Sequence, residues 1–241
     1  VRALARRGLQ MTILQPDHEG RLAPATLAAA LTPQTRLVTL LHVNNETGVA
    51  QDLAALAEVC TSRGVALHID ACQGAGKVPL DVAGLQMLSF TAHKLGGPQG
   101  IGALYVAPAH RGYIEPMILG GGQERGLRAG TLATHQIAGF GLACRLARES
   151  LPAFGRRMSA LRERLRKGLS DLPGVILNGH PSRHAPHILN LTFAGVEGES
   201  LFLGLPGLVL STGSACNSAS AEPSYVLRSL GRSPQHAQAS L

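Results

Sequence analysis

The sequence is poor in lysine, in aromatic residues and in long apolar runs. It has three lysines, Lys77, Lys94 and Lys167, beside nineteen arginines, and only 3% of its residues are aromatic. So few rings argue against stacking platforms for single-stranded nucleic acid. No uncharged apolar run reaches the roughly 18 residues of a membrane span. Because arginine keeps its proton in proteins, only the three lysines can supply a nucleophilic amine.

The charge balance is basic, with a formal net charge of +7 that comes almost entirely from arginine. Such a balance can indicate nucleic-acid binding. The densest basic stretch, residues 156–167, has helical spacing, and its charges lie mostly off a stripe of Met158, Leu161 and Leu165. This pattern favours a solvated helix face over a binding surface. Direct nucleic-acid binding is therefore not expected.

The four cysteines, Cys60, Cys72, Cys144 and Cys216, form no C-x-x-C pair. Their spacing fits neither a zinc site nor a disulfide framework. Cys60 and Cys144 fall on apolar helical faces, which predicts buried thiols. This usage is typical of a reducing, cytoplasmic setting.

Cys216 lies among small polar residues in STGSACNSAS. This setting favours an exposed, mobile thiol, although a cysteine merely tolerated in a loop is the alternative. No Ser-His-Asp or Cys-His arrangement can be read from the sequence, so a protease has little support.

Apolar runs alternate with helical patterns over residues 1–150. Strands are predicted over 11–15, 36–43, 65–70, 87–93 and 101–107, and helices over 22–32 and 52–64. Strands that are apolar throughout, with helices between them, indicate a mainly parallel sheet with helices on both faces. The predicted architecture is therefore α/β, in a large domain of residues 1–150.

The pattern changes after residue 150. A long helix is predicted over 152–171. After it, strands are predicted over 175–179, 187–193 and 208–211, and shorter helices over 198–205 and 223–231. This order predicts a smaller α+β domain over residues 151–241. We expect that domain to be incomplete.

Polar clusters follow three of the apolar strands: NNETG (44–48), DACQG (70–74) and the T-x-H-K set that ends at Lys94. In open α/β sheets, ligands bind outside the carboxyl ends of the strands. The three clusters are therefore expected to meet in one crevice.

Asp70 and Lys94 are the residues of these clusters with the most specific chemistry. A carboxylate at a strand end can keep the ring nitrogen of pyridoxal phosphate (PLP) protonated, and a lysine can bond to the cofactor aldehyde. Each residue alone is weak evidence for such a site, since Asp70 could cap the next helix and Lys94 could be a surface residue. The pair indicates a PLP site more strongly.

Two further groups of residues could bind phosphate. Thr91 and His93 flank Lys94 and can donate hydrogen bonds. The glycine-rich stretch 120–131, which ends in Thr131, could form an anion-binding nest of amides. A flexible loop is the alternative for this stretch.

Five motifs, in this order, resemble those of NifS/IscS-type cysteine desulfurases, PLP enzymes of the class-V aminotransferase group. They are HVNNETG, HIDACQGAGK, SFTAHKLGGPQGIGALYV, GGGQERGLRAGT and the segment 211–231 around Cys216. The resemblance covers nearly the whole chain, and the ordered set is far more specific than any single motif. It implies a fold-type-I PLP-dependent transferase that forms a homodimer. It also implies conversion of L-cysteine to L-alanine, with the sulfur carried as a persulfide on an enzyme cysteine.

By position in these motifs, the resemblance implies a role for each residue. Lys94 would hold the cofactor covalently and transfer protons, and Asp70 would pair with its ring nitrogen. Asn45 and Gln73 would contact the cofactor hydroxyl or the substrate. Thr91 and His93 would bind the cofactor phosphate, and Thr131 would bind the phosphate of the partner subunit's cofactor. Cys216 would attack the substrate sulfur.

The loop around Cys216 resembles that of the long-loop desulfurases. These deliver sulfur to an iron–sulfur scaffold protein or to partners that thiolate tRNA. A loop of serine, glycine and alanine permits a sulfur carrier to move between a buried cofactor and an outside acceptor.

The sequence also departs from the family pattern. The family's cofactor-stacking histidine and its arginine in an S-I-R-F-S-type motif have no counterpart here, and GLQMLSF is about two residues short. We therefore expect a chain truncated at both ends, with weak or no desulfurase activity. Alternatives are a selenocysteine lyase, another class-V PLP enzyme, or an inactive fragment of a desulfurase.

Overall fold

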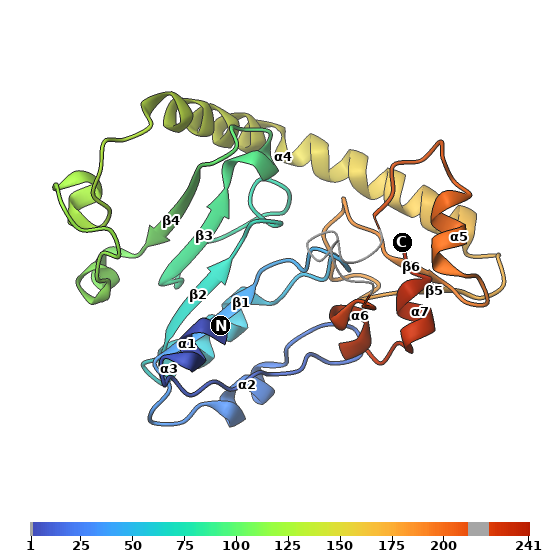
Figure 1. Cartoon of the computed structure of the whole chain (residues 1–241), viewed down its shortest axis with the longest axis horizontal. Helices are drawn as coiled ribbons and strands as arrows, with labels where there is room; N and C mark the ends of the chain where they lie inside the picture. Colours follow the sequence, from blue (N-terminus) through green and yellow to red (C-terminus); the bar gives the residue numbers. More distant parts are fainter. Residues whose placement is uncertain (1, 212–221) are drawn as a thin grey trace.

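A four-stranded sheet forms the centre of the larger part of the molecule (Figure 1). We describe residues 2–211 and 222–241 of a computed structural model. The strands are β1 (Leu37–Leu41), β2 (Ala66–Asp70), β3 (Met87–Thr91) and β4 (Gly102–Val106), in that spatial order. β1, β2 and β3 are parallel, and β4 is antiparallel to β3. The predicted mainly parallel α/β sheet is confirmed.

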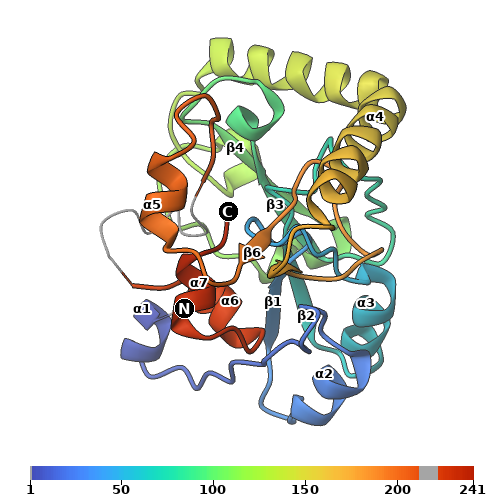
Figure 2. The same ribbon diagram turned by 90° about the vertical axis from the view of Figure 1, so that its right-hand side faces the viewer.

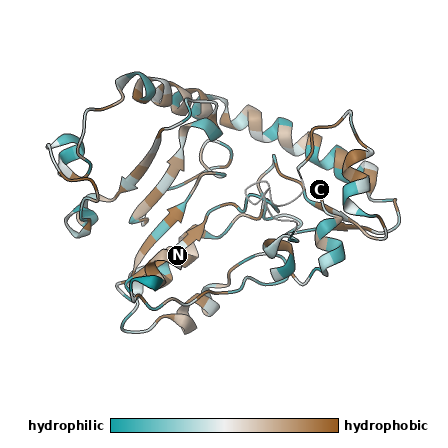
Figure 3. Cartoon of the chain, viewed as in Figure 1, coloured by the Kyte–Doolittle hydropathy of each residue, from teal (hydrophilic) through white to brown (hydrophobic). Residues whose placement is uncertain are grey.

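Two helices, α2 (Pro24–Ala30) and α3 (Leu53–Ser62), pack together over one face of the sheet. The core between α3 and the strands contains Leu56, Cys60 and Leu67 with no exposed surface. The Cys60 thiol is therefore buried, as predicted, whereas Cys144 is half-buried. Figure 3, coloured by hydropathy, shows apolar residues along much of the strands.

The other face of the sheet carries the alternate side chains of each strand. Leu37, Leu41 and Leu104 point to this face and are 49%, 41% and 53% exposed. The helical cover predicted for both faces is therefore incomplete on this face, in the part of the chain that the structure describes.

A single helix, α4 (Thr134–Leu169), joins the sheet to the C-terminal part of the molecule (Figure 1). It has 36 residues and contains Pro152. The helix predicted over 152–171 is thus the second half of a longer one. Because α4 runs through residue 150, the predicted boundary between two domains falls inside a continuous helix.

The C-terminal part combines a two-stranded antiparallel sheet with short helices (Figure 2). Its elements are β5 (Val175–Leu177), β6 (Leu191–Phe193), α5 (Gly198–Leu203), α6 (Tyr225–Ser229) and α7 (Pro234–Gln238). The remaining described elements of the chain are α1 (Arg2–Arg6), η1 (Ala92–Leu95), η2 (Pro108–Tyr113) and η3 (Gln123–Gly126). No helix in the described ranges is long and apolar enough to cross a membrane.

Two strand predictions were wrong. Residues 11–15 and 208–211 have no regular secondary structure, and Ile13 and Val209 are largely exposed. Both segments have strand-forming residues. A segment with such residues becomes a strand only where it pairs with another strand, because strand propensity mostly reflects packing in a sheet.

In the basic stretch of α4, Arg156, Arg157 and Arg164 are exposed as predicted, but Arg162 is not. Arg162 is buried, whereas Leu161 and Leu165 are about half exposed. The Arg162 Nε donates a hydrogen bond of 2.9 Å to the Ile188 carbonyl. The aliphatic part of an arginine side chain can cover apolar surface while its guanidinium donates a hydrogen bond. Arg162 therefore faces the loop before β6, and the leucine stripe does not.

Candidate functional site

The strand register brings three polar segments to one edge of the sheet. Asp70, the last residue of β2, pairs with Leu41 of β1 and Ser89 of β3. Beyond the strands, the His42 N–H donates to the Asp70 carbonyl and the Ala71 N–H to the Ser89 carbonyl, both at 2.8 Å. The segments that follow β1, β2 and β3 therefore start side by side, at the carboxyl edge where ligands bind in such sheets.

The Asp70 carboxylate lies within a turn that it helps to hold. Its Oδ1 accepts a hydrogen bond of 2.9 Å from the Cys72 N–H, which is an Asx-type turn. The Cys72 thiol lies close to the same carboxylate. Burial, and then the hydrogen bond and negative charge of Asp70, raise the pKa of the Cys72 thiol to about 11, while the Lys94 charge lowers it. Asp70, Cys72 and Lys94 thus share one electrostatic environment.

This raised pKa predicts slow alkylation of Cys72. In the cofactor-free protein, iodoacetamide should modify Cys72 slowly at pH 7 to 8 and faster as the pH approaches 11, because the thiolate is the nucleophile. Asp70→Asn should move the alkylation profile of Cys72 to lower pH, since it removes the negative charge. Peptide mapping separates Cys72 from the other cysteines. An unchanged profile in Asp70→Asn would contradict the assigned contact.

Lys94 and His93 are presented by the short turn η1. Gly96 ends this turn in the left-handed region, with φ of 77°, which glycine adopts without strain. Both side chains are exposed. The Thr91 hydroxyl and His93 Nδ1 are 2.9 Å apart, so these two candidate phosphate-binding groups are adjacent.

The other predicted residues are placed less closely together. In the NNETG turn, Asn44 accepts the hydrogen bonds that hold the turn, from Glu46 and Thr47, and Asn45 is exposed. Gln73 is half-buried in the turn after Asp70. Thr131 is exposed in the segment before α4, and within the described chain no hydrogen bond links it to the other site residues. Cys216 lies outside the described residues.

A hydrogen-bonded chain crosses three strands beside the site, and it was missed from the sequence. Thr39 Oγ1 lies 2.8 Å from His68 Nδ1, and His68 Nε2 lies 3.0 Å from Ser89 Oγ. The alternation of VALHID and LSFT carries the signal, because it places His68 and Ser89 on the same sheet face as Asp70 and Thr91. Burial lowers the pKa of His68, and the Asp70 charge opposes this effect.

The sheet and the positions of Asp70, Thr91 and Lys94 define an α/β protein with a candidate ligand site at the carboxyl ends of its strands. The chain belongs to the class-V aminotransferase family, whose model matches residues 1–241. It is 50% identical, over 242 residues, to cysteine desulfurase IscS of Azotobacter vinelandii and to that of Pseudomonas entomophila. These matches cover the whole of this chain and 60% of each relative, so the chain spans about 60% of the length of these curated relatives.

Solved structures of similar proteins have the same fold. DndA from Streptomyces lividans is 36% identical, with a TM-score of 0.84 over 99% of this chain and 68% of its own. SspA in complex with cysteine is 33% identical, with a TM-score of 0.85 over 99% of this chain and 67% of its own. The predicted fold-type-I architecture of NifS-like PLP enzymes is therefore confirmed.

Proposed function

We propose that this protein is a PLP-dependent cysteine desulfurase. It converts L-cysteine to L-alanine and passes the sulfur to Cys216 for iron–sulfur cluster or thio-cofactor assembly. The observation that supports this most is the meeting of Asp70, Thr91 and Lys94 at the carboxyl edge of β2 and β3. The family match over the full chain supports the same reading.

The donor set at this edge fits PLP. Asp70 uses Oδ1 for the turn, and a carboxylate offers about four acceptor sites, so it retains capacity for a protonated ring nitrogen. Lys94 supplies an amine, and Thr91 and His93 are adjacent donors for phosphate. When bound, the cofactor supplies an electron sink for bond cleavage at the substrate.

The chain's own residues have these roles in the proposal. Lys94 Nζ holds the cofactor covalently and transfers protons at the substrate. Asp70 keeps the ring nitrogen protonated, and its Asx-type turn fixes the direction of the carboxylate. Asn45 and Gln73, whose amides take part in no other assigned hydrogen bond in the described chain, orient the cofactor hydroxyl or the substrate.

Cys216 receives the sulfur. Its thiolate attacks the substrate sulfur and an S–S bond forms as the carbon–sulfur bond breaks. The electron pair of the broken bond stays with carbon, which takes up a proton to give alanine. The persulfide then transfers its outer sulfur to an acceptor, such as an iron–sulfur scaffold protein. Cys60, Cys72 and Cys144 are free thiols, which fits a cytoplasmic setting.

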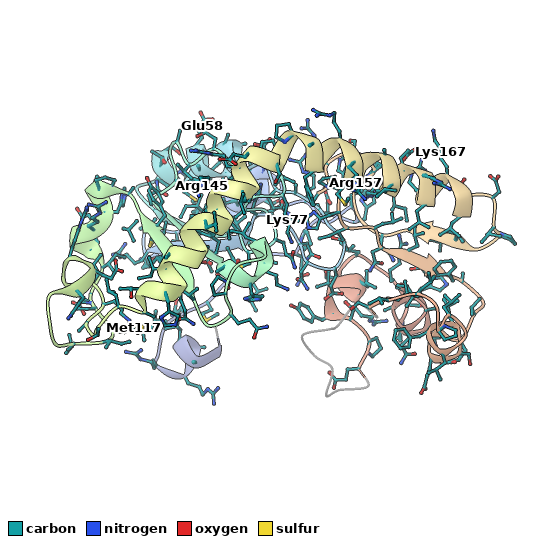
Figure 4. The ribbon with its side chains drawn as sticks, turned by 90° about the horizontal axis from the view of Figure 1, so that it is seen from above. Glu58, Lys77, Met117, Arg145, Arg157 and Lys167 are labelled. Atoms are coloured by element: carbon teal, nitrogen blue, oxygen red, sulfur yellow. The ribbon has the colours of Figure 1, made fainter. Side chains whose placement is uncertain are left out.

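A homodimer is part of the proposal. Residues 113–119 expose large apolar side chains: Tyr113, Met117 and Leu119 are 84%, 95% and 80% exposed. Met117 lies at one end of the molecule in Figure 4. Exposed apolar side chains gathered in one segment indicate an interface. In this dimer, Thr131 would bind the phosphate of the partner subunit's cofactor.

The test compares L-cysteine with L-selenocysteine as substrates of the PLP-loaded protein. The proposal predicts alanine from L-cysteine, together with a persulfide that maps to Cys216. Turnover of selenocysteine with none of cysteine would instead identify a selenocysteine lyase. Turnover of neither substrate would favour the inactive-fragment alternative.

A further inference from the structure

A cavity of about 640 Å³ lies where α4 passes between the sheet and the C-terminal part. Its walls come mainly from three segments that are far apart in the sequence, residues 77–79, residues 151–159 of α4 and residues 182–186, and His42 and Ala50 complete the lining. Figure 4 shows Lys77 beneath α4 between the two parts of the molecule. The proposed desulfurase chemistry assigns no role to this cavity.

Two cations line the cavity without a counter-charge. The Lys77 ammonium and the Arg183 guanidinium form no ion pair and no hydrogen bond within the described residues, and no Asp or Glu is among the described lining residues. Lys77 is half-buried. Partial burial of a cation costs free energy unless the cation is paired, so Lys77 favours a negatively charged group in the cavity.

Two histidines near these cations have buried ring nitrogens that form no hydrogen bond within the described residues. His42, which lines the cavity, is 6% exposed, and its Nδ1 has no hydrogen-bond partner. His187 follows the lining segment 182–186, and both of its ring nitrogens are buried and unpartnered. Burial lowers the pKa of both histidines to about 4, so each is neutral at pH 7. They therefore add no charge to the surroundings of the cavity.

The rest of the cavity wall is largely apolar. It is formed mainly by Ala50, Val78, Pro79, Leu151, Pro152 and Pro186. An inorganic ion would leave these side chains without a partner, whereas an organic anion could contact them with its carbon skeleton. The cavity thus combines two cations that form no ion pair in the described chain with a largely apolar lining, which is the composition of a site for an amphipathic anion.

We propose that this cavity binds a small organic carboxylate, with its carboxylate at Lys77 and Arg183 and its apolar body against α4 and Pro186. This inference is independent of the proposed desulfurase function. Burial, and then the Lys94 charge, lower the pKa of Lys77, and a bound carboxylate would favour the charged form of this lysine.

The test uses the scarcity of lysine in this chain. Protein labelled with ¹³Cε-lysine gives three NMR signals, from Lys77, Lys94 and Lys167, which single Lys→Arg variants assign. On titration with 2-naphthoate, the Lys77 signal should shift and saturate. Lys167, which is 71% exposed and paired with Glu163, should not respond. The neutral analogue 2-naphthalenemethanol should bind at least about tenfold more weakly, or about 1.4 kcal/mol.

Substitution of the lining cations separates this site from general apolar adsorption. Lys77→Met and Arg183→Met should each raise the Kd for 2-naphthoate at least about tenfold, because each removes a charge-assisted contact. Arg157→Met, at an exposed position of α4 (Figure 4), is the matched control and should leave the Kd unchanged. Arg183 is exposed, so its variant remains informative if Lys77→Met is poorly folded. A shift of Lys94 alone, an equal response of Lys167, no response at all, or equal affinity for the neutral analogue would overturn the proposal.

Discussion

Cys216→Ala should reduce alanine formation from L-cysteine by at least about a hundredfold relative to the unsubstituted protein. In the proposed function Cys216 is the nucleophile that accepts the sulfur, and removal of a covalent nucleophile typically costs orders of magnitude in rate. Lys94 and Asp70 are untouched, so cofactor binding should persist. The measurement is alanine release by the PLP-loaded protein under excess L-cysteine.

Cys144→Ala is the matched control for this variant. Cys144 is half-buried in α4 and has no role in the proposed chemistry, so its substitution should leave turnover within about twofold. Equal activity of Cys216→Ala and the unsubstituted protein with cysteine would remove Cys216 from the sulfur path. Such a result would favour a lyase in which no enzyme thiol accepts the sulfur.

Asn178→Ala should lower the free energy of unfolding by about 3 kcal/mol or more. Asn178 is 1% exposed, and its Nδ2 donates to Asn190 Oδ1 at 2.7 Å and to Thr192 Oγ1 at 2.8 Å. Its Oδ1 accepts from Arg232 Nε. Alanine would leave the buried Asn190 Oδ1 and the half-buried Arg232 Nε without this partner, and each unpaired group costs about 1–3 kcal/mol. Because Arg232 also bonds to the Leu177 carbonyl, the network ties the start of α7 to β5.

Chemical denaturation monitored by circular dichroism measures this effect. Gln34→Ala, at an exposed turn position, should change stability by less than about 0.5 kcal/mol. A loss in Asn178→Ala no larger than that of Gln34→Ala would mean that the buried amide network contributes no net stability.

The parallel part of the fold was predictable because its signals are local. The runs that became β1, β2 and β3 are largely apolar and end in polar residues, and a helical pattern separates the first two. Parallel strands of a covered sheet produce such runs. Asp70 and Lys94 could be singled out because each directly follows one of these runs. The family motifs then restricted the chemistry further.

The predictions that failed concern features that depend on contacts between residues far apart in the sequence. Residues 11–15 have strand-forming composition but pair with no strand of the described chain, so they are irregular. The Arg162 side chain is buried because the Ile188 carbonyl, 26 residues away, accepts its hydrogen bond. The Asn178 network likewise joins residues that are up to 62 positions apart. Periodicity within one helix or strand carries no information about such partners.

The most direct test of the central claim is to locate the covalent cofactor. The protein is incubated with PLP, reduced with borohydride and digested, and the pyridoxyl mass is mapped to a peptide. We predict label on Lys94 alone, with no label in Lys94→Arg and a strong reduction in Asp70→Ala. Lys77 and Lys167 serve as internal controls in the same digest. Label spread over Lys77 and Lys167, or no label at all, would contradict the assignment of Lys94 as the cofactor lysine.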